Sequence, residues 1–277
     1  MYKKKPQTIL LDMTTWCNLK CPMCPQSFEE LDKTRHKGIM DFEMSKQIID
    51  QLYTITGEHT VGCVLPYWNG EPLLYPKFIE FLEYCKSKDI INHGIGAFDL
   101  NTNAGILTNK KSKAILESQL FPVVLFSIDA TTKSTYDKVR AGGDFYQTID
   151  NIKNFVKMRE EYRIENPQNI WPDRIIFQFI TMEINQHEAL QFYHDWSTFL
   201  KSYNLDFQVN YWWDEPAPIM KDTIFLKRCF EGGIEHQNIL NKLHKKVVHE
   251  IGLISDDQLK SKKMIFRTDE TTGQEIF

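Results

Sequence analysis

The chain has 277 residues, of which 42% are hydrophobic, and it carries a formal net charge of −4 at pH 7. This length supports one sizeable core, and the slightly acidic balance argues against nucleic-acid binding. No apolar run approaches the ~18 residues of a transmembrane helix, so we expect no membrane association. The basic run at residues 3–5 is not followed by an apolar signal region, which favours a cytoplasmic protein.

Short apolar segments alternate with amphipathic helical segments along most of the chain. This alternation predicts an α/β fold with a parallel sheet and crossover helices, although it does not separate an open sheet from a barrel. No GxGxxG motif opens a helix, so a dinucleotide-binding fold has no support. We expect strands at residues 8–14, 61–65, 97–102, 123–128, 174–181 and 207–211.

Three of the six cysteines, Cys17, Cys21 and Cys24, follow the first predicted strand with the spacing CxxxCxxC. Thiolates this close together in an intracellular chain indicate metal or redox chemistry rather than a disulfide framework. Iron–sulfur clusters are commonly held by four cysteines. With only three here, a 4Fe–4S cluster would keep one iron open for a further ligand.

Two other interpretations of this stretch remain open. A structural zinc site would need a fourth ligand, for which His36 is the nearest candidate. Cys21 and Cys24 also form a CxxC pair, which is typical of a catalytic dithiol. The dithiol interpretation leaves Cys17 unexplained.

The cysteine triplet resembles the signature of the radical S-adenosylmethionine (SAM) superfamily. The resemblance implies that Cys17, Cys21 and Cys24 hold a 4Fe–4S cluster whose fourth iron is chelated by SAM. Reductive cleavage of SAM would give a 5′-deoxyadenosyl radical that takes hydrogen from a substrate, with a flavodoxin- or ferredoxin-type reductant supplying electrons. It also implies a partial (β/α)6 TIM-like barrel with its site at the carboxyl ends of the strands.

A second motif, Asn69-Gly70-Glu71-Pro72, follows the second predicted strand and resembles the GGEP motif of the same superfamily. In that family the motif contacts the amino group of SAM, so Asn69, Gly70 and Glu71 are candidate cofactor-binding residues. Asn69 replaces the usual first glycine, and asparagine tolerates left-handed backbone better than most residues. By itself, the motif also fits an ordinary Asn-Gly turn.

The run SIDA at 127–130, followed by TYDKVRAGG at 135–143, resembles the branch of this superfamily that carries SPASM or twitch extensions. The resemblance places Ser127 and Asp129 near the cofactor and Arg140 near its carboxylate, which a guanidinium binds well. Alternatively, Arg140 is a cation in the last turn of a helix and Asp129 is a cap.

Weaker matches extend the candidate cofactor site. Thr102 and Asn103 precede Ala104, and together they resemble the TNG motif after the third strand. Asn185 matches a family asparagine after the fifth strand. Met23 occupies the position that packs against adenine in this family, where its thioether would replace an aromatic ring.

The C-terminal region departs from the SPASM pattern, because it holds one cysteine, Cys229, rather than a cysteine-rich segment. We therefore expect no auxiliary cluster, with Cys63 and Cys85 acting as small core residues. We expect a barrel over 1–215 and a short appendage over 216–277 that is partly disordered at its end. Cys229 is a candidate hydrogen donor, and the aromatic and acidic residues at 211–215 form either a substrate wall or a lid.

The sequence thus predicts a radical SAM oxidoreductase or maturase. Peptide modification is favoured by the resemblance to the SPASM branch, while sugar or alcohol oxidation and epimerisation remain open. The alternative from another class is a binding protein that is stabilised by a bound metal and that has kept the barrel but lost catalytic activity.

Overall fold

The computed structural model describes residues 8–28, 36–56, 61–93, 95–211, 220–229, 234–260, 267–268 and 275–276. Its strands are β1 (Thr8–Leu10), β2 (Cys63–Leu65), β3 (Asp99–Thr102), β4 (Val123–Ser127), β5 (Arg174–Thr181), β6 (Phe207–Asn210), β7 (Asp222–Arg228), β8 (Arg267–Thr268) and β9 (Glu275–Ile276). Its α-helices are α2 (Phe42–Thr56), α3 (Phe78–Ser87), α4 (Asn109–Ser118), α5 (Lys133–Val139), α6 (Phe145–Glu165), α7 (Ala189–Ser202), α8 (Ile234–Glu250) and α9 (Asp256–Lys260). Single 3-10 turns are η1 (Pro25–Ser27), η2 (Pro72–Leu74) and η3 (Gln186–Glu188).

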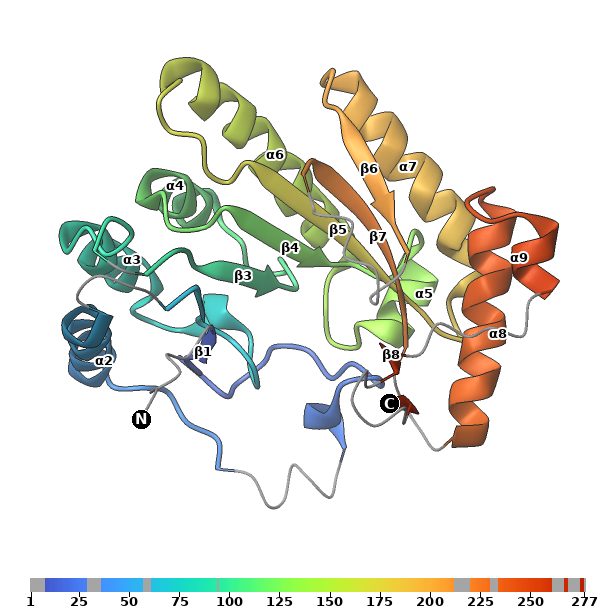
Figure 1. The fold of residues 1–277 in the computed structure, drawn as a ribbon, viewed down its shortest axis with the longest axis horizontal. Coiled ribbons are helices and arrows are strands. Elements are labelled where there is room, and N and C mark those ends of the chain that lie inside the picture. Colours follow the sequence, from blue (N-terminus) through green and yellow to red (C-terminus); the bar gives the residue numbers. More distant parts are fainter. Residues whose placement is uncertain are drawn as a thin grey trace.

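The main sheet is parallel and has the strand order β3-β4-β5-β7-β6. Strands β1 and β2 pair in parallel beside it, and a parallel bridge from Val64 to Phe98 connects β2 to the segment that leads into β3. The strands therefore follow one another in a single curved series, as expected for a partial α/β barrel (Figure 1).

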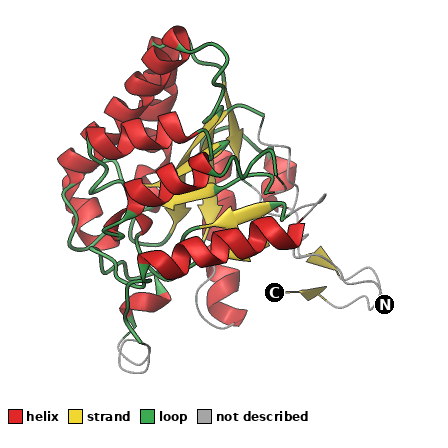
Figure 2. Ribbon diagram, turned by 90° about the vertical axis from the view of Figure 1, so that its left-hand side faces the viewer, coloured by secondary structure: helices red, strands yellow, loops and turns green. Residues whose placement is uncertain are grey.

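Helices cover the outer side of this curved series, where α2, α3, α4, α6 and α7 form an arc (Figures 1 and 2). Aromatic side chains pack between the sheet and these helices. The ring centroids of Phe177 and Trp196 of α7 are 4.4 Å apart, and those of Phe126 and Phe155 of α6 are 5.4 Å apart. Side chains alternate along a strand, so their neighbours Gln178 and Ser127 point into the barrel interior. No helix in the described ranges is long and apolar enough to cross a membrane.

The expected boundary at residue 215 falls inside the sheet. Strand β7 lies beyond that boundary, yet it pairs with β5 on one side and β6 on the other. Ile224 and Leu226 are fully buried in the main core, which is why this segment belongs to the barrel and not to an appendage. Helix α8 packs against β5 and β7. The expected disorder at the chain end lies largely outside the described residues.

Candidate functional site

The cysteine loop follows β1 and lies at the carboxyl ends of the strands. Cys21 is buried, Cys24 is half-buried and Cys17 is exposed. The Cys24 amide donates a hydrogen bond to the Cys21 carbonyl at 3.0 Å, which forms a tight turn between these two cysteines. The Lys20 amide donates to the carbonyl of Ala141 at 2.8 Å and so anchors the loop to the segment after α5.

Nitrogen donors point at two of the three sulfurs. The Leu19 amide lies 3.4 Å from Cys17 Sγ, and Asn103 Nδ2 lies 3.9 Å from the same atom. Arg140 Nη1 donates to Cys21 Sγ at 3.6 Å. Although the Cys17 side chain is exposed, the protein atoms packed around its sulfur partly desolvate it and raise the pKa of the thiol to about 11. A bound metal would convert this thiol to the thiolate at neutral pH.

These residues fit an iron–sulfur cluster better than a single metal ion. Within the described part of the chain, no three His, Cys, Asp or Glu side chains converge tightly enough to enclose one ion. A preformed zinc site that includes His36 is therefore not seen. Three cysteines spaced along one loop suit a larger cluster, and hydrogen bonds to the sulfurs are one of the levers that tune such clusters.

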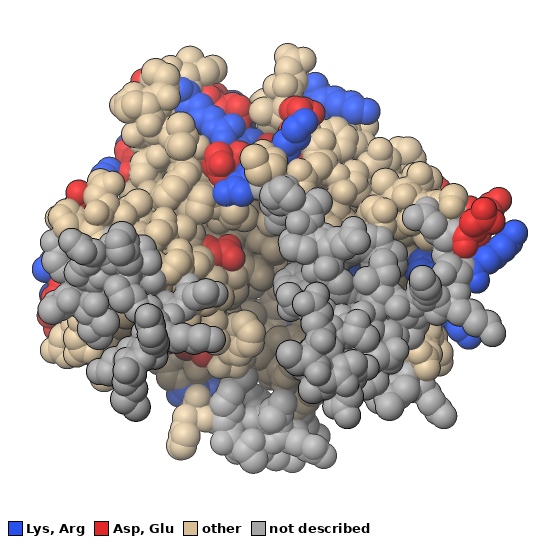
Figure 3. Space-filling model, in the orientation of Figure 1, with Lys and Arg blue, Asp and Glu red and all other residues tan. Residues whose placement is uncertain are grey.

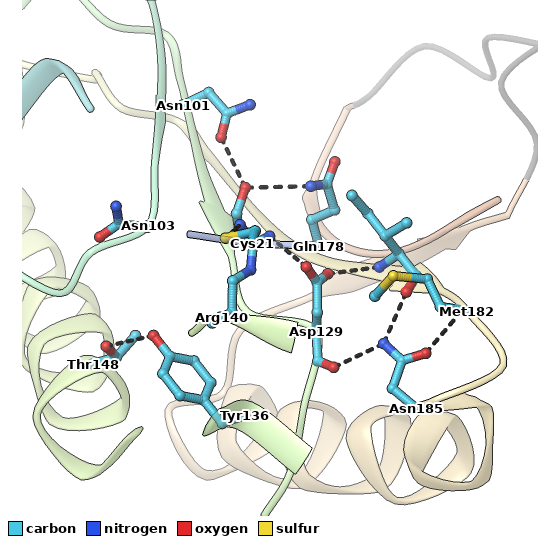
Figure 4. A network of polar contacts seen from close by, with 12 residues as sticks. Cys21, Asn101, Asn103, Asp129, Tyr136, Arg140, Thr148, Gln178, Met182 and Asn185 are labelled. Atoms are coloured by element: carbon cyan, nitrogen blue, oxygen red, sulfur yellow. Dashed lines mark hydrogen bonds and ion pairs between the residues drawn. The ribbon is translucent and has the colours of Figure 1, made fainter. Parts of the chain in front are cut away.

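Arg140 is shared between Cys21 and the strand end that follows β4. Its Nη2 forms an ion pair with Asp129 Oδ2, and the Asp129 side chain is fully buried (Figure 4). The Ile180 amide donates to Asp129 Oδ1 at 2.6 Å. Arg140 Nε is buried and has no hydrogen-bond partner among the described residues, so this donor is available to a ligand.

Neighbouring residues determine both the backbone conformation and the pKa of Asp129. Its φ of +64° lies in the left-handed region, which non-glycine residues adopt mainly where neighbouring contacts impose it. Burial raises the pKa of Asp129, and the adjacent Arg140 guanidinium opposes that rise. The reciprocal effect of Asp129 and Cys21 outweighs burial and raises the pKa of Arg140. The ion pair and the constrained backbone together fix the position of the Arg140 guanidinium.

Asn185 holds this strand end in place. Its Oδ1 accepts from the Met182 amide at 2.8 Å, and its Nδ2 donates to the carbonyls of Asp129 and Ile180, each at 2.9 Å (Figure 4). The side-chain amide is fully buried and all its hydrogen-bonding groups are used. The structure thus places Asn185 as a positioning residue for Asp129.

A polar ladder crosses the barrel interior beneath the loop. Ser127 Oγ donates to Asn101 Oδ1 at 3.0 Å and accepts from Gln178 Nε2 at 3.3 Å (Figure 4). Sequence reasoning singled out Ser127 but missed Asn101 and Gln178. Both are polar residues inside apolar strand segments, which was the signal that they face a polar interior.

The Asn69-Gly70 turn is tied to the strand end before the cysteines. Asp12, which the sequence analysis missed, accepts from the Asn69 amide at 2.9 Å and from Asn69 Nδ2 at 2.5 Å. A Cβ atom on Gly70 would lie 2.2 Å from the carbonyl oxygen of Thr14 and 2.7 Å from that of Trp16. Glycine is therefore required here by close backbone packing between the two motifs.

Glu71 links the second motif to the end of β3. One carboxylate oxygen accepts from Leu73 N at 3.1 Å and from Thr102 Oγ1 at 2.6 Å, and the other accepts from Asn103 N at 2.9 Å. Glu71 is 3% exposed, so its carboxylate is fully used within the protein. Ala104, where the family motif has glycine, adopts a φ of +57°. Glu71 and Thr102 thus position Asn103 against Cys17.

Met23 and Cys229 share a small apolar cluster beside Arg140. Cys229 is 4% exposed at the end of β7, and it packs with Tyr136 and Met182, against which Met23 also lies. Cys229, though distant in the sequence, thus belongs to the cluster against which Met23 of the cysteine loop packs. Cys85 is fully buried in the core as expected, whereas Cys63 is only half-buried. Residues 212–215, expected to wall a pocket or form a lid, lie outside the described residues.

Residues 11–161, more than half of the chain, match the family model described as the radical SAM superfamily. The chain belongs to the radical SAM superfamily. Members of this superfamily are enzymes that use a 4Fe–4S cluster and SAM, and the matched segment contains the cysteine loop and the motifs up to Arg140.

The curated relatives differ in activity. The tungsten-containing aldehyde ferredoxin oxidoreductase cofactor-modifying protein of Pyrococcus furiosus is 28% identical over 166 residues, 57% of this chain and 41% of the relative. The GTP 3′,8-cyclase of Alkaliphilus oremlandii is 26% identical over 166 residues, 57% of this chain and 46% of the relative. The chain thus spans less than half the length of these relatives.

Solved structures support the fold. The structure of anSMEcpe with bound AdoMet matches with a TM-score of 0.56 and 17% identity, covering 89% of this chain and 60% of that chain. The FeFe-hydrogenase maturase HydG from Carboxydothermus hydrogenoformans matches with a TM-score of 0.52 and 13% identity, covering 88% and 51%. At these identities the likeness concerns the fold alone, and it agrees with a partial barrel.

Proposed function

We propose that this chain cleaves SAM reductively at a 4Fe–4S cluster and uses the resulting radical to abstract hydrogen from an organic substrate. The observation that carries the proposal is the cysteine loop itself, whose sulfurs receive nitrogen donors and whose position is the carboxyl end of a parallel α/β barrel. When bound, the cluster and SAM supply a 5′-deoxyadenosyl radical, as is general in the superfamily.

The protein's own residues have three tasks in this proposal. Cys17, Cys21 and Cys24 hold the cluster, while Asn103 and Arg140 direct N–H groups at two of the sulfurs. Arg140 Nε, which has no partner among the described residues, and the Ser127 ladder offer hydrogen bonds to SAM. Met23 provides apolar contact for adenine. Glu71, Thr102, Asp129 and Asn185 act by holding these groups in position.

The outcome after hydrogen abstraction is proposed only by class. A cofactor-modifying protein and a GTP cyclase are both relatives, so the family relationship leaves the substrate open. Oxidation or maturation of a peptide agrees with the SPASM-like run at 127–143, with sugar or alcohol oxidation and epimerisation as alternatives. Cys229 lies beside the site and is our candidate hydrogen donor for the epimerase alternative. A flavodoxin- or ferredoxin-type protein would supply electrons.

The test is production of 5′-deoxyadenosine. The anaerobically reconstituted protein should form it from SAM and dithionite, and the Cys21→Ala variant should lose at least ~100-fold of this activity because the cluster loses one of its three ligands. Cys85→Ala is the matched control, since Cys85 is buried in the core far from the loop in the chain. Equal activity in wild type and Cys21→Ala would contradict the proposal, and no product from the fully loaded protein would favour the non-catalytic binding alternative.

A further inference from the structure

A second polar group lies deeper in the barrel than the ladder at Ser127. Asp99 is the first residue of β3, on the same strand face as Asn101 and two residues before it. At 3.3 Å per residue, its side chain begins about 7 Å further from the carboxyl ends of the strands. Tyr67, which follows β2, reaches down to Asp99, and its hydroxyl donates to Asp99 Oδ2 at 3.4 Å.

Asp99 differs from the other inward carboxylates in having few partners. Asp129 is paired with Arg140, and Glu71 receives three hydrogen bonds. Asp99 accepts the long Tyr67 hydrogen bond and one from the backbone at Leu100, and no Lys, Arg or His in the described ranges forms an ion pair with it. A partly buried carboxylate without a cation lowers the stability of a protein, and a cationic ligand would compensate it.

Among Asp99, Cys63 and Tyr67, Asp99 is the group whose protonation changes near neutral pH. Burial raises its pKa to about 6, although the Tyr67 hydrogen bond opposes the rise. Cys63, which faces Asp99 from β2, has a pKa raised to about 11 by burial and then by Asp99, and burial likewise raises the pKa of Tyr67. On the other side, Asp99 is in register with Val123 of β4, which is apolar. At pH 7 Asp99 is therefore the charged member of this group.

The side chains around Asp99 on the inner side of the strands keep part of their surface exposed. Tyr67, Asp99, Asn101 and Leu125 are all half-buried on the inner side, whereas their outward-facing neighbours on these strands are buried. The side of the molecule seen in Figure 3 is hollowed near its centre. A molecule that lies along the inner faces of β3 and β4 beneath Ser127 would approach Asp99.

We infer that Asp99 and Tyr67 form a substrate subsite inside the barrel that binds a cationic nitrogen, such as an alkylammonium group. The carboxylate supplies the charge and the tyrosine ring supplies an apolar and cation-binding wall. This inference rests on the proposed function, because it names the substrate class of the same site. In this arrangement the cationic end of the substrate lies below the polar ladder. The part of the substrate near Ser127 is then the part that reacts.

The experiment measures binding of two small probes to the reconstituted, SAM-loaded protein under anaerobic conditions. By titration calorimetry or ligand-observed NMR, n-butylammonium should bind at least ~10-fold more tightly than n-butanol at pH 7. The preference should disappear in Asp99→Asn and persist in Asp150→Asn, a change on the exposed side of α6. In the wild type it should also fade as the pH falls below about 6, when Asp99 becomes protonated.

Thermal unfolding separates a binding role from a structural one. Because the pKa of Asp99 is higher in the folded than in the unfolded chain, its charge is destabilising at pH 7, and Asp99→Asn should raise the melting temperature. A lowered melting temperature, or an ammonium preference that survives Asp99→Asn, would overturn the inference. Formation of 5′-deoxyadenosine in the same preparation without any ammonium preference would refute the subsite and leave the proposed function intact.

Discussion

Replacement of Asp222 by alanine is expected to lower the free energy of unfolding by about 3–5 kcal/mol, since it removes both Nη hydrogen bonds of a buried guanidinium, which among the described residues keeps only Glu160 at its Nε. Arg159 on α6 donates to both carboxylate oxygens of Asp222, with both N–O distances at 2.6 Å. The two side chains are 1% and 4% exposed. Asp222 Oδ1 also accepts from the Ile175 amide at 2.7 Å, so one carboxylate joins α6, β5 and β7.

The matched control for this change is the ion pair between Lys133 and Asp137. Its N–O distance is also 2.6 Å, but its side chains are 53% and 45% exposed. Asp137→Ala should therefore cost less than ~1 kcal/mol. Urea denaturation of both variants measures the difference. Similar losses for Asp222→Ala and Asp137→Ala would show that burial does not govern the strength of these pairs and would contradict the account.

Lowering the pH from 6.5 to 4 is expected to destabilise the wild type through His244 on α8. This side chain is 1% exposed, and its Nε2 lies 2.9 Å from the Tyr211 carbonyl while its Nδ1 lies 3.1 Å from Thr181 Oγ1. A carbonyl only accepts, so Nε2 carries a proton, and in the neutral imidazole Nδ1 accepts from the threonine hydroxyl. Burial favours this neutral form.

The direction follows from the pKa values in the two states. Burial lowers the pKa of His244 from 6.5 to about 4 in the folded protein, with a further lowering by Arg228 and an opposing effect of the Tyr211 hydrogen bond. The unfolded chain therefore binds the proton first as the pH falls, and stability that is complete above pH 6.5 is lost towards pH 4. At ~1.4 kcal/mol per tenfold change, the loss is about 3 kcal/mol.

Carboxylates also titrate in this range, so the comparison must be made between variants. His244→Gln should unfold with a shallower dependence on pH between 6.5 and 4 than the wild type, whatever its stability at pH 7. His249→Gln is the control, because His249 is on the same helix but pairs with Asp256 at an exposed position. Chemical denaturation at several pH values gives the slopes. Equal slopes in wild type and His244→Gln would show that this histidine is not buried in its neutral form.

Local patterns predicted most of the barrel. Apolar segments gave the strand positions up to β6, and the range 174–181 agrees with β5 at both ends. Strand β7 lies in the range expected to form an appendage, and it is a short apolar run with charged residues, Asp222 and Arg228, at its two ends. Asp222 is accommodated there by Arg159, which lies 63 residues away in the chain. No local pattern reveals a partner at that distance.

The candidate site was predictable in its membership and less so in its roles. Motif resemblance identified residues that do gather around the cysteine loop, such as Asn103 and Arg140. Whether a side chain faces a ligand or another strand depends on long-range hydrogen bonds. Only the structure shows that the side chains of Glu71 and Asn185 form their hydrogen bonds within the protein. The contribution of Asn101 depends on its hydrogen bond with Ser127 of the neighbouring strand, 26 residues away in the chain.

The central claim is that three cysteines hold a cluster with one iron open to SAM, and electron paramagnetic resonance of the dithionite-reduced protein tests it most directly. Wild-type protein reconstituted to about four irons per chain should give the spectrum of a reduced 4Fe–4S cluster, and addition of SAM should change it because the open iron gains ligands. Cys24→Ala should lose the signal. A cluster spectrum that is unchanged by SAM, or one that survives in Cys24→Ala, would contradict the account.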